Sequence, residues 1–334
     1  RQNASSSIVD LKELKIKMEA SRILRVSSLK DEMFKGLIPA TVLPMDENYM
    51  IDEDDLRRYI DWISNFKISG LAVNVDTGEG PHLYLEEQLK VIRIYKEELK
   101  GRIPIVAGLS TRFTMEAAKT AKMLKEAGAD ALLVFPIPAY AGEPLDPEIP
   151  YRYHKAIAEA AGIPLIAFQL QRSLGGIEYS ETSLKRLMEV EGIAAIKEAS
   201  FDAMKFLETV KIVRSLKRKV YMLTGNDNFI LESFILGAEG ALLGFGTIAT
   251  DLQVEMIEEA KSGNYEEAFK IAEKVQPLAD MIFMSPVRNY RARLKEALVM
   301  MGVLKEAYVR PPLTSISDAE RKAVRKALEK AGLL

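Results

Sequence analysis

The segment GIAAIKEAS, residues 192–200, is an apolar run between two amphipathic stretches. Such a run, apolar at nearly every position, is typical of a strand covered on both faces in a parallel sheet. A helical pattern precedes it from residue 181 to 190, and another follows from residue 202 to 215. The segment is therefore a strand within a strand–helix series, and its neighbours along the chain decide the fold.

The same unit occurs eight times. The strands are expected at residues 37–42, 71–74, 103–107, 131–135, 164–168, 193–197, 220–224 and 240–244. The helices that follow them are expected at residues 53–66, 85–99, 114–127, 149–161, 181–190, 202–215, 228–236 and 251–262. Eight units predict an α/β fold of the (β/α)8 TIM-barrel type. A doubly wound sheet is the alternative, but the first turn, LPMD at residues 43–46, lacks its phosphate-binding glycines.

The 334 residues divide into three parts. Residues 1–34 are predicted to be an N-terminal extension with a short amphipathic helix that packs on the main domain or on a neighbouring subunit. Residues 35–262 form the predicted barrel. Residues 263–334 form a predicted C-terminal helical subdomain, with helices expected at residues 266–281, 289–301 and 318–331.

Composition restricts the chemistry. The chain has no cysteine and only two histidines, His82 and His154, which excludes thiolate nucleophiles, iron–sulfur clusters and three-histidine metal sites. Lysine plus arginine (46) nearly balances aspartate plus glutamate (48), so we expect no nucleic-acid partner. No apolar run reaches the roughly 18 residues of a membrane span, so we expect no membrane partner and a cytoplasmic location. Catalysis must therefore rely mainly on Lys, Asp, Glu, Tyr, Thr and backbone groups.

Active sites of such barrels lie at the carboxyl ends of the strands. Lys197 ends the sixth strand, where the surrounding apolar side chains would lower the pKa of its amine. A lysine placed in this way can attack a carbonyl carbon and form a Schiff base. The alternative is a lysine that simply pairs with a carboxylate such as Asp76.

A turn of small residues, TGEG at 77–80, follows the second strand. The Thr77 hydroxyl and the N–H groups of the turn, Gly78 included, could bind a carboxylate. An ordinary strand-to-helix turn is the alternative. Gly244 and Gly246 at the eighth strand could hold a phosphate, although close backbone packing explains two glycines equally well.

Five segments resemble the dihydrodipicolinate synthase and N-acetylneuraminate lyase family of class I, Schiff-base aldolases. The resemblance covers residues 36–334, and its most specific match is the lysine segment at residues 196–200. The five matching segments are Leu43–Asp46, Val75–Glu79, Ile196–Ser200, Gly225–Asp227 and Val309–Leu313.

This chain departs from the family pattern at several positions. Asp76 replaces the first threonine of the turn, and Phe168 replaces the strand-five tyrosine that serves as general acid/base. The arginine that the synthases place beyond that tyrosine would fall at Ser173, with Arg172 beside it. Tyr140 is a loose match for a tyrosine that reaches a neighbouring subunit's site.

The resemblance implies that Lys197 forms a Schiff base with pyruvate or another 2-oxo acid, such as a 2-keto-3-deoxy sugar acid. Thr77 and Gly78 would bind the carboxylate, Gly244 and Phe168 would line the pocket, and Gln169 would bind substrate hydroxyls or pair internally. We hypothesise that Asp76, desolvated beside Lys197, carries protons in place of the missing tyrosine, with Tyr140 as a further candidate. No metal or other cofactor is expected, and the chain is expected to form a homo-oligomer, a dimer or tetramer.

Three other functions stay open at this point. The chain could be a 4-hydroxy-tetrahydrodipicolinate synthase of lysine biosynthesis, although it lacks the strand-five tyrosine and the arginine expected of such a synthase. It could be a sensor that binds a 2-oxo acid without catalysis. A magnesium enzyme that stabilises an enolate is the third, with ligands from the strand-end carboxylates Asp76, Glu79, Glu198 and Asp227.

Overall fold

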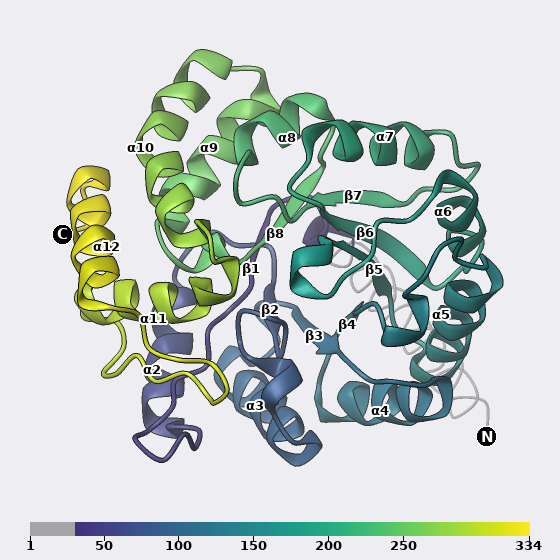
Figure 1. Cartoon of the computed structure of the whole chain (residues 1–334), viewed down its shortest axis with the longest axis horizontal. Coiled ribbons are helices and arrows are strands. Elements are labelled where there is room, and N and C mark those ends of the chain that lie inside the picture. The colour runs from purple at the N-terminus through teal and green to yellow at the C-terminus, as the bar shows by residue number, and fades with distance from the viewer. Residues whose placement is uncertain (1–30) are drawn as a thin grey trace, which may run out of the picture.

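The computed structural model describes residues 31–334. The helix expected near the front of the N-terminal extension lies outside these residues. The described chain forms a barrel of eight parallel strands ringed by helices, with further helices packed against one side (Figure 1). The predicted (β/α)8 fold is therefore confirmed.

The strands run in the order β1-β8-β7-β6-β5-β4-β3-β2, and every pairing is parallel. An isolated parallel bridge between Ala40 and Ala72 joins β1 to β2, and the Thr41 N–H donates to the Ala72 carbonyl at 2.9 Å. These contacts close the barrel. The strands are β1 Leu37–Pro39, β2 Leu71–Val73, β3 Ile105–Leu109, β4 Ala131–Val134, β5 Leu165–Leu170, β6 Ile193–Ala199, β7 Tyr221–Thr224 and β8 Gly240–Leu243.

A helix follows each strand and covers the outside of the barrel (Figure 1). Several begin at side-chain caps that the sequence contains, since Asp52, Ser180, Asp202 and Ser317 each accept a hydrogen bond from a first-turn N–H. The helices are α2 Glu53–Ile63, α3 Leu85–Leu99, α4 Thr114–Ala127, α5 Glu148–Ala161, α6 Glu181–Leu187, α7 Ala203–Arg214, α8 Ile230–Leu236 and α9 Thr250–Ser262.

Three more helices form the C-terminal subdomain: α10 Tyr265–Phe283, α11 Tyr290–Met300 and α12 Asp318–Ala331. Helix α10 packs against α8 and α9, and α12 packs against α10 and α11. Short 3-10 turns lie at the carboxyl ends of several strands, among them η3 at Arg172–Leu174 and η4 at Phe245–Thr247. The subdomain thereby lies beside the end of the barrel where the active site was expected.

The hydrophobic core has two layers. One layer fills the barrel interior with residues such as Ile38, Val106 and Leu223. Met33 and Phe34 also belong to this layer and are 1% exposed. The last two residues of the expected extension therefore pack with the barrel core.

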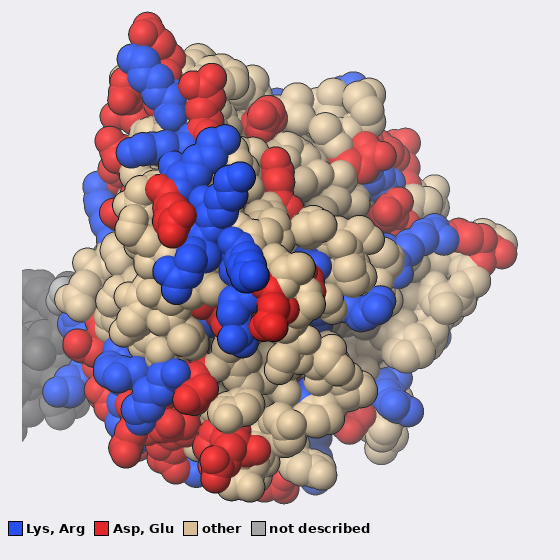
Figure 2. All heavy atoms as spheres, turned by 60° about the vertical axis from the view of Figure 1, so that its left-hand side comes forward, with Lys and Arg blue, Asp and Glu red and all other residues tan. Residues whose placement is uncertain are grey.

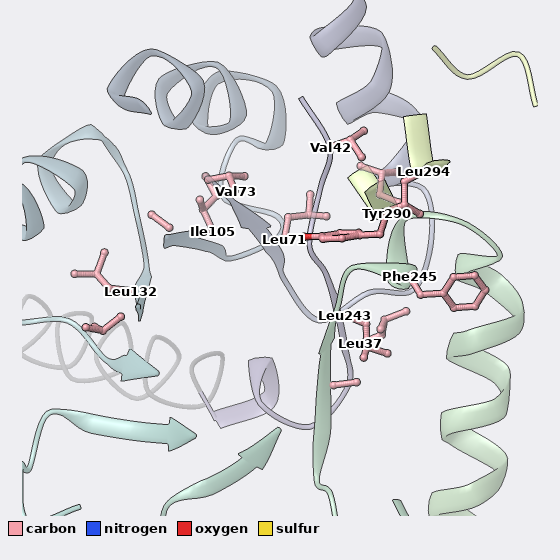
Figure 3. Close-up of a cluster of buried hydrophobic side chains, with 14 of the residues drawn as sticks. Leu37, Val42, Leu71, Val73, Ile105, Leu132, Leu243, Phe245, Tyr290 and Leu294 are labelled. Atoms are coloured by element: carbon pink, nitrogen blue, oxygen red, sulfur yellow. The ribbon is translucent and has the colours of Figure 1, made fainter. Parts of the chain in front are cut away.

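The second layer lies between the strands and the helices. Figure 3 shows part of it, with Leu37 and Leu243 from neighbouring strands and Leu294 from α11. Tyr290, also on α11, reaches from the C-terminal subdomain toward the strands in the same view. The subdomain is therefore continuous with the barrel core and can supply side chains to the strand ends.

No helix within residues 31–334 has the length and apolar character needed to cross a membrane. Basic and acidic side chains are interspersed over the face that carries the C-terminal helices (Figure 2). Helix α12 carries several exposed lysines and arginines, namely Arg321, Lys322, Arg325, Lys326 and Lys330.

Candidate active site

Lys197 lies near the carboxyl end of β6 and points into a pocket at the mouth of the barrel. The residue is 9% exposed, and its Nζ lies 4.4 Å from the centre of the Phe168 ring. Burial lowers the pKa of this amine to about 8, although the negative charges of Asp227 and Asp76 oppose the shift. A fraction of the amine is therefore unprotonated and nucleophilic near neutral pH.

The pocket has both apolar and polar walls, and a larger space adjoins it. About 30 Å³ is open around Lys197, which is enough space for at least one water molecule. Leu170 and Leu174 line both this space and an outer chamber of about 690 Å³. These two leucines therefore form a wall that the two spaces share.

Two glycines permit the close packing around the lysine. A Cβ atom on Gly225 would lie 2.5 Å from Lys197 Cε, so the position leaves no room for a side chain. A Cβ atom on Gly244 would lie 3.0 Å from the Phe283 ring and 3.1 Å from Thr77 Oγ1. Gly244 thus lies in the pocket wall, as the sequence predicted, but its role is close approach rather than a phosphate cradle.

Thr77 and Phe168 also line this pocket, as expected. Thr77 is 3% exposed, and its Oγ1 lies 3.4 Å from the hydroxyl of Tyr290. Gly78 is not among the lining residues, and a Cβ atom there would lie 2.8 Å from the Thr41 carbonyl oxygen. The position therefore leaves no room for a side chain, and Gly78 can contribute only its backbone N–H group to a site.

Asp76 has a different environment from the one expected. Its side chain is 22% exposed and forms an ion pair with Arg291, so it is not a desolvated carboxylate that faces Lys197 alone. Arg291 Nε also donates to the Asp76 carbonyl at 2.8 Å, and the Tyr290 hydroxyl donates to Asp76 Oδ2 at 2.9 Å. Adjacent residues of α11 thus fix both the backbone and the side chain of Asp76.

Asp227 is the carboxylate that fits the expected description. It is 4% exposed, lines the pocket with Lys197, and accepts a hydrogen bond from the Phe245 N–H at 2.8 Å. Burial raises its pKa to about 7, although that hydrogen bond and the charge of Lys197 oppose the shift. Asp227 and Lys197 therefore influence each other's protonation near neutral pH.

This coupling predicts the effect of Asp227→Asn on the amine. The Asp227 charge raises the pKa of Lys197, so its removal should lower that pKa below about 8. The rate of imine formation with pyruvate rises as the amine loses its proton, and the midpoint of that rise should therefore move to lower pH. The exposed Asp61→Asn on α2 is the control and should leave the midpoint unchanged. A midpoint that moves to higher pH in Asp227→Asn would contradict the assignment.

Gln169 follows the second of the two alternatives left open by the sequence, because its side chain pairs internally and does not line the pocket. The residue is fully buried, and its Nε2 donates to Glu198 Oε1 at 3.0 Å and to Thr209 Oγ1 at 2.9 Å. Its Oε1 accepts from the Tyr179 N–H. Alternation along β5 turns Gln169 outward when Phe168 turns inward, so it cannot bind a substrate hydroxyl.

Tyr140 corrects a sequence expectation. It is 1% exposed within a single chain, and its ring packs edge-on against Tyr153 and Tyr179 in the outer core. Its hydroxyl lies 3.5 Å from His154 Nδ1, a residue whose pKa burial lowers to about 4. Tyr140 lines neither the Lys197 pocket nor the outer chamber.

The strand-end carboxylates do not converge on a metal site. Glu198 turns away from Lys197 and accepts from Asn226 and Gln169, while Glu79 pairs with Lys295 from α11. Only Asp76 and Asp227 line the pocket, and Asp76 is paired with Arg291. In residues 31–334 no group of three or more acidic or histidine side chains is arranged to hold a metal ion.

Sequence reasoning missed the residues from the C-terminal subdomain. Tyr290 and Phe283 line the pocket with their rings stacked 4.9 Å apart, and Arg291 lines the outer chamber. Burial, with a smaller contribution from the charge of Asp76, raises the pKa of Tyr290 well above its usual value. Nothing in the local pattern of residues 283–291 indicates that this segment returns to the second strand.

Comparison with known proteins gives consistent results. The model of the Dihydrodipicolinate synthetase family matches residues 33–331. A 4-hydroxy-tetrahydrodipicolinate synthase from Bradyrhizobium diazoefficiens is 33% identical over 308 residues, which cover 90% of this chain and 98% of that protein. The enzyme of the same name from Chlorobium phaeovibrioides is 30% identical over 306 residues, 92% of this chain and 100% of its own length.

Solved structures show the same similarity. The chloride-inhibited dihydrodipicolinate synthase from Acinetobacter baumannii, complexed with pyruvate, superposes with a TM-score of 0.80 at 29% identity, covering 90% of this chain and all of that one. A monomeric dihydrodipicolinate synthase variant gives a TM-score of 0.82 at 26% identity, covering 91% and 98%. Sequence, fold and family model agree over the whole barrel and the C-terminal helices. The chain therefore belongs to the dihydrodipicolinate synthetase family.

Proposed function

We propose that this protein is a Schiff-base lyase, an aldolase or dehydratase, that acts on pyruvate or another 2-oxo acid. The observation that carries the proposal is Lys197, a buried amine whose pKa is lowered and which faces a pocket. The hydroxyl of Thr77 in the wall of this pocket can bind the substrate carboxylate. Membership of the family and the pyruvate complex of the Acinetobacter baumannii synthase support the choice of substrate class.

The reaction begins with the Lys197 amine. Its lone pair attacks the keto carbon, and the keto oxygen leaves as water, so a protonated imine forms. This positively charged group withdraws electrons from the neighbouring carbon–carbon bond, which can then break or form through a neutral enamine. If C3 loses a proton instead, the resulting enamine keeps the C4 hydroxyl and can expel it, which gives dehydration.

The substrate carboxylate is held by the turn after β2. Thr77 contributes its hydroxyl, which lies in the pocket wall. The N–H groups of Glu79 and Gly80 are already bonded to the carbonyls of Asp76 and Val75, each at 3.0 Å. Among the described residues of this turn, that leaves the N–H groups of Thr77 and Gly78 for the carboxylate.

The test of this proposal is reductive trapping. The wild-type protein is incubated with pyruvate and sodium borohydride, and its intact mass is measured against controls that lack either reagent. A single added mass per chain is expected, because borohydride reduces the imine to a stable secondary amine. A protein that gains no mass under these conditions is not a Schiff-base lyase.

The relatives' name suggests a narrower function, 4-hydroxy-tetrahydrodipicolinate synthase, as the second candidate. Two observations weigh against it here. Phe168 has no hydroxyl, and Arg172 lies on the surface in an ion pair with Glu143, with both side chains 62% exposed. The site therefore lacks, at this position, the arginine that would bind the carboxylate of the aldehyde substrate. Turnover of 2-oxo acid substrates separates either enzyme from a non-catalytic sensor.

We propose that the chain forms a homo-oligomer, as expected for its family, but that its chemistry does not depend on assembly. The pocket residues Lys197, Thr77 and Asp227 and the paired Asp76 and Tyr290 all belong to one chain. The burial of Tyr140 in its own core supports a site that takes no tyrosine from a partner at that position.

A further inference from the structure

The pocket around Lys197 contains a phenol that comes from outside the barrel. Phe168, on β5, presents only a hydrocarbon ring to Lys197. Tyr290, the first residue of α11, lines the same pocket from the C-terminal subdomain, and its hydroxyl lies beside Asp76 and Thr77. The pocket therefore has a phenol from α11 and none from β5.

The Tyr290 hydroxyl is held by two partners. It donates to Asp76 Oδ2 at 2.9 Å and lies 3.4 Å from Thr77 Oγ1. Its ring is stacked on Phe283 at 4.9 Å, and the residue is only 4% exposed. Arg291, the next residue, holds Asp76 in place from its other side. Position and orientation of the phenol are therefore fixed by contacts from both the barrel and α11.

We propose that Tyr290 and Asp76 together carry the protons of the reaction at Lys197. The proposal rests on the proposed Schiff-base function and names the residues that take over from the absent strand-five tyrosine. Asp76 is the acceptor that receives the phenolic proton, and Tyr290 is the group that exchanges protons with the substrate. Thr77, which lies beside the same hydroxyl, places the substrate carboxylate next to this path.

The proton balance can be followed for the cleavage of a 4-hydroxy-2-oxo acid bound to Lys197 as an iminium. The C4 hydroxyl gives its proton to the Tyr290 oxygen as the Tyr290 proton moves to Asp76 Oδ2. The electron pair of the C3–C4 bond moves to form the enamine, and an aldehyde leaves. Tyr290 then delivers its proton to C3 and recovers one from Asp76, which restores the iminium. The substrate hydroxyl proton has thus been transferred to C3, with no net change in the protein.

Burial supports this assignment because it keeps the phenol protonated and able to donate at neutral pH. Asp76 is already engaged in an ion pair with Arg291, so the phenol rather than the carboxylate exchanges protons directly with the substrate. The hydrogen bond between the two residues couples them, so that a phenolic proton lost to Asp76 is replaced from the substrate.

The proposal is tested with pyruvate alone, which avoids the need to know the aldehyde. In D₂O, the enamine of bound pyruvate takes up deuterium at its methyl carbon, and proton NMR measures the rate of loss of the methyl signal. Tyr290→Phe removes one oxygen and keeps the stacking on Phe283. We expect the exchange rate to fall by about 10²–10⁴-fold, the usual contribution of general acid–base catalysis, while borohydride trapping of pyruvate persists.

Tyr179→Phe is the matched control. Tyr179 is equally buried, lies outside the pocket, and has a hydroxyl that bonds to no group within residues 31–334. The Tyr179→Phe protein should exchange the methyl protons of pyruvate for deuterium at the wild-type rate. Unchanged exchange in Tyr290→Phe would overturn the proposal, as would a loss of trapping together with exchange, because Tyr290 would then serve imine formation or the fold.

A double-variant cycle tests whether Tyr290 and Asp76 act as one path. If they do, Asp76→Asn should also slow exchange, and the double variant should be no slower than the slower single variant. Multiplied effects in the double variant would overturn the shared path. Failure of the wild-type protein to trap pyruvate would instead contradict the proposed function itself, so the two failures are distinguishable.

Discussion

Lys197→Arg is expected to form no borohydride-stable adduct with pyruvate and to lose turnover by a factor on the order of 10⁴ or more. Arginine preserves the positive charge that faces Asp227 and Asp76. Its guanidinium, however, keeps its proton throughout the accessible pH range and cannot attack a carbonyl. The substitution thus removes the nucleophile while it disturbs the local charge as little as possible.

Lys211→Arg on α7 is the matched control, because this exposed lysine lies outside the pocket. It should trap pyruvate and turn over substrate at wild-type rates. Circular dichroism of both variants shows whether the fold is retained. An adduct of normal yield in Lys197→Arg would show that a different lysine carries the imine.

Glu79→Gln is expected to destabilise the fold by about 3–5 kcal/mol, because it breaks a buried ion pair and leaves an ammonium uncompensated. Glu79 Oε1 lies 2.5 Å from Lys295 Nζ, and both side chains are fully buried. The second carboxylate oxygen accepts from the Arg310 N–H at 2.7 Å. This pair therefore ties the turn that carries Thr77 to helix α11, which carries Tyr290.

The measurement is the midpoint of urea unfolding, with Glu258→Gln as the control. Glu258 pairs with Lys67 at the surface, where the side chains are 52% and 80% exposed, and its loss should change the free energy of unfolding by less than about 1 kcal/mol. Equal midpoint shifts in the two variants would contradict a structural role for the buried pair.

The barrel could be predicted from the sequence because each strand is apolar along its length and each is followed by a helical pattern. These are local properties, and the structure reproduces them to within a few residues at most ends. The position of Lys197 followed from the rule that places active sites at the carboxyl ends of the strands. The turn at Thr77 followed in the same way.

The orientation of individual side chains could not be predicted with equal success. Gln169 adjoins Phe168 in sequence, yet alternation along β5 places its amide on the outer face with Glu198. Tyr140 follows a strand end, yet its ring turns into the outer core. A residue's position near a strand end therefore shows that it lies in the region of the active site. Whether it lines the site depends on the direction in which its side chain points.

The contacts from α11 were beyond sequence reasoning for a different reason. Tyr290 and Arg291 lie more than 200 positions after Asp76 in the chain, and only the packing of the C-terminal subdomain against the barrel brings them together. The same packing explains why Asp76 is ion-paired and why Asp227, rather than Asp76, is the buried carboxylate beside Lys197.

The central claim is that Lys197 carries a covalent imine with a 2-oxo acid, and the most direct measurement locates that bond. The wild-type protein is trapped with pyruvate and borohydride, digested with a protease, and mapped by mass spectrometry. The account predicts that the added mass lies on the Lys197 side chain within the segment AAIKEAS, residues 194–200. An adduct on another lysine, or none on Lys197, would contradict it.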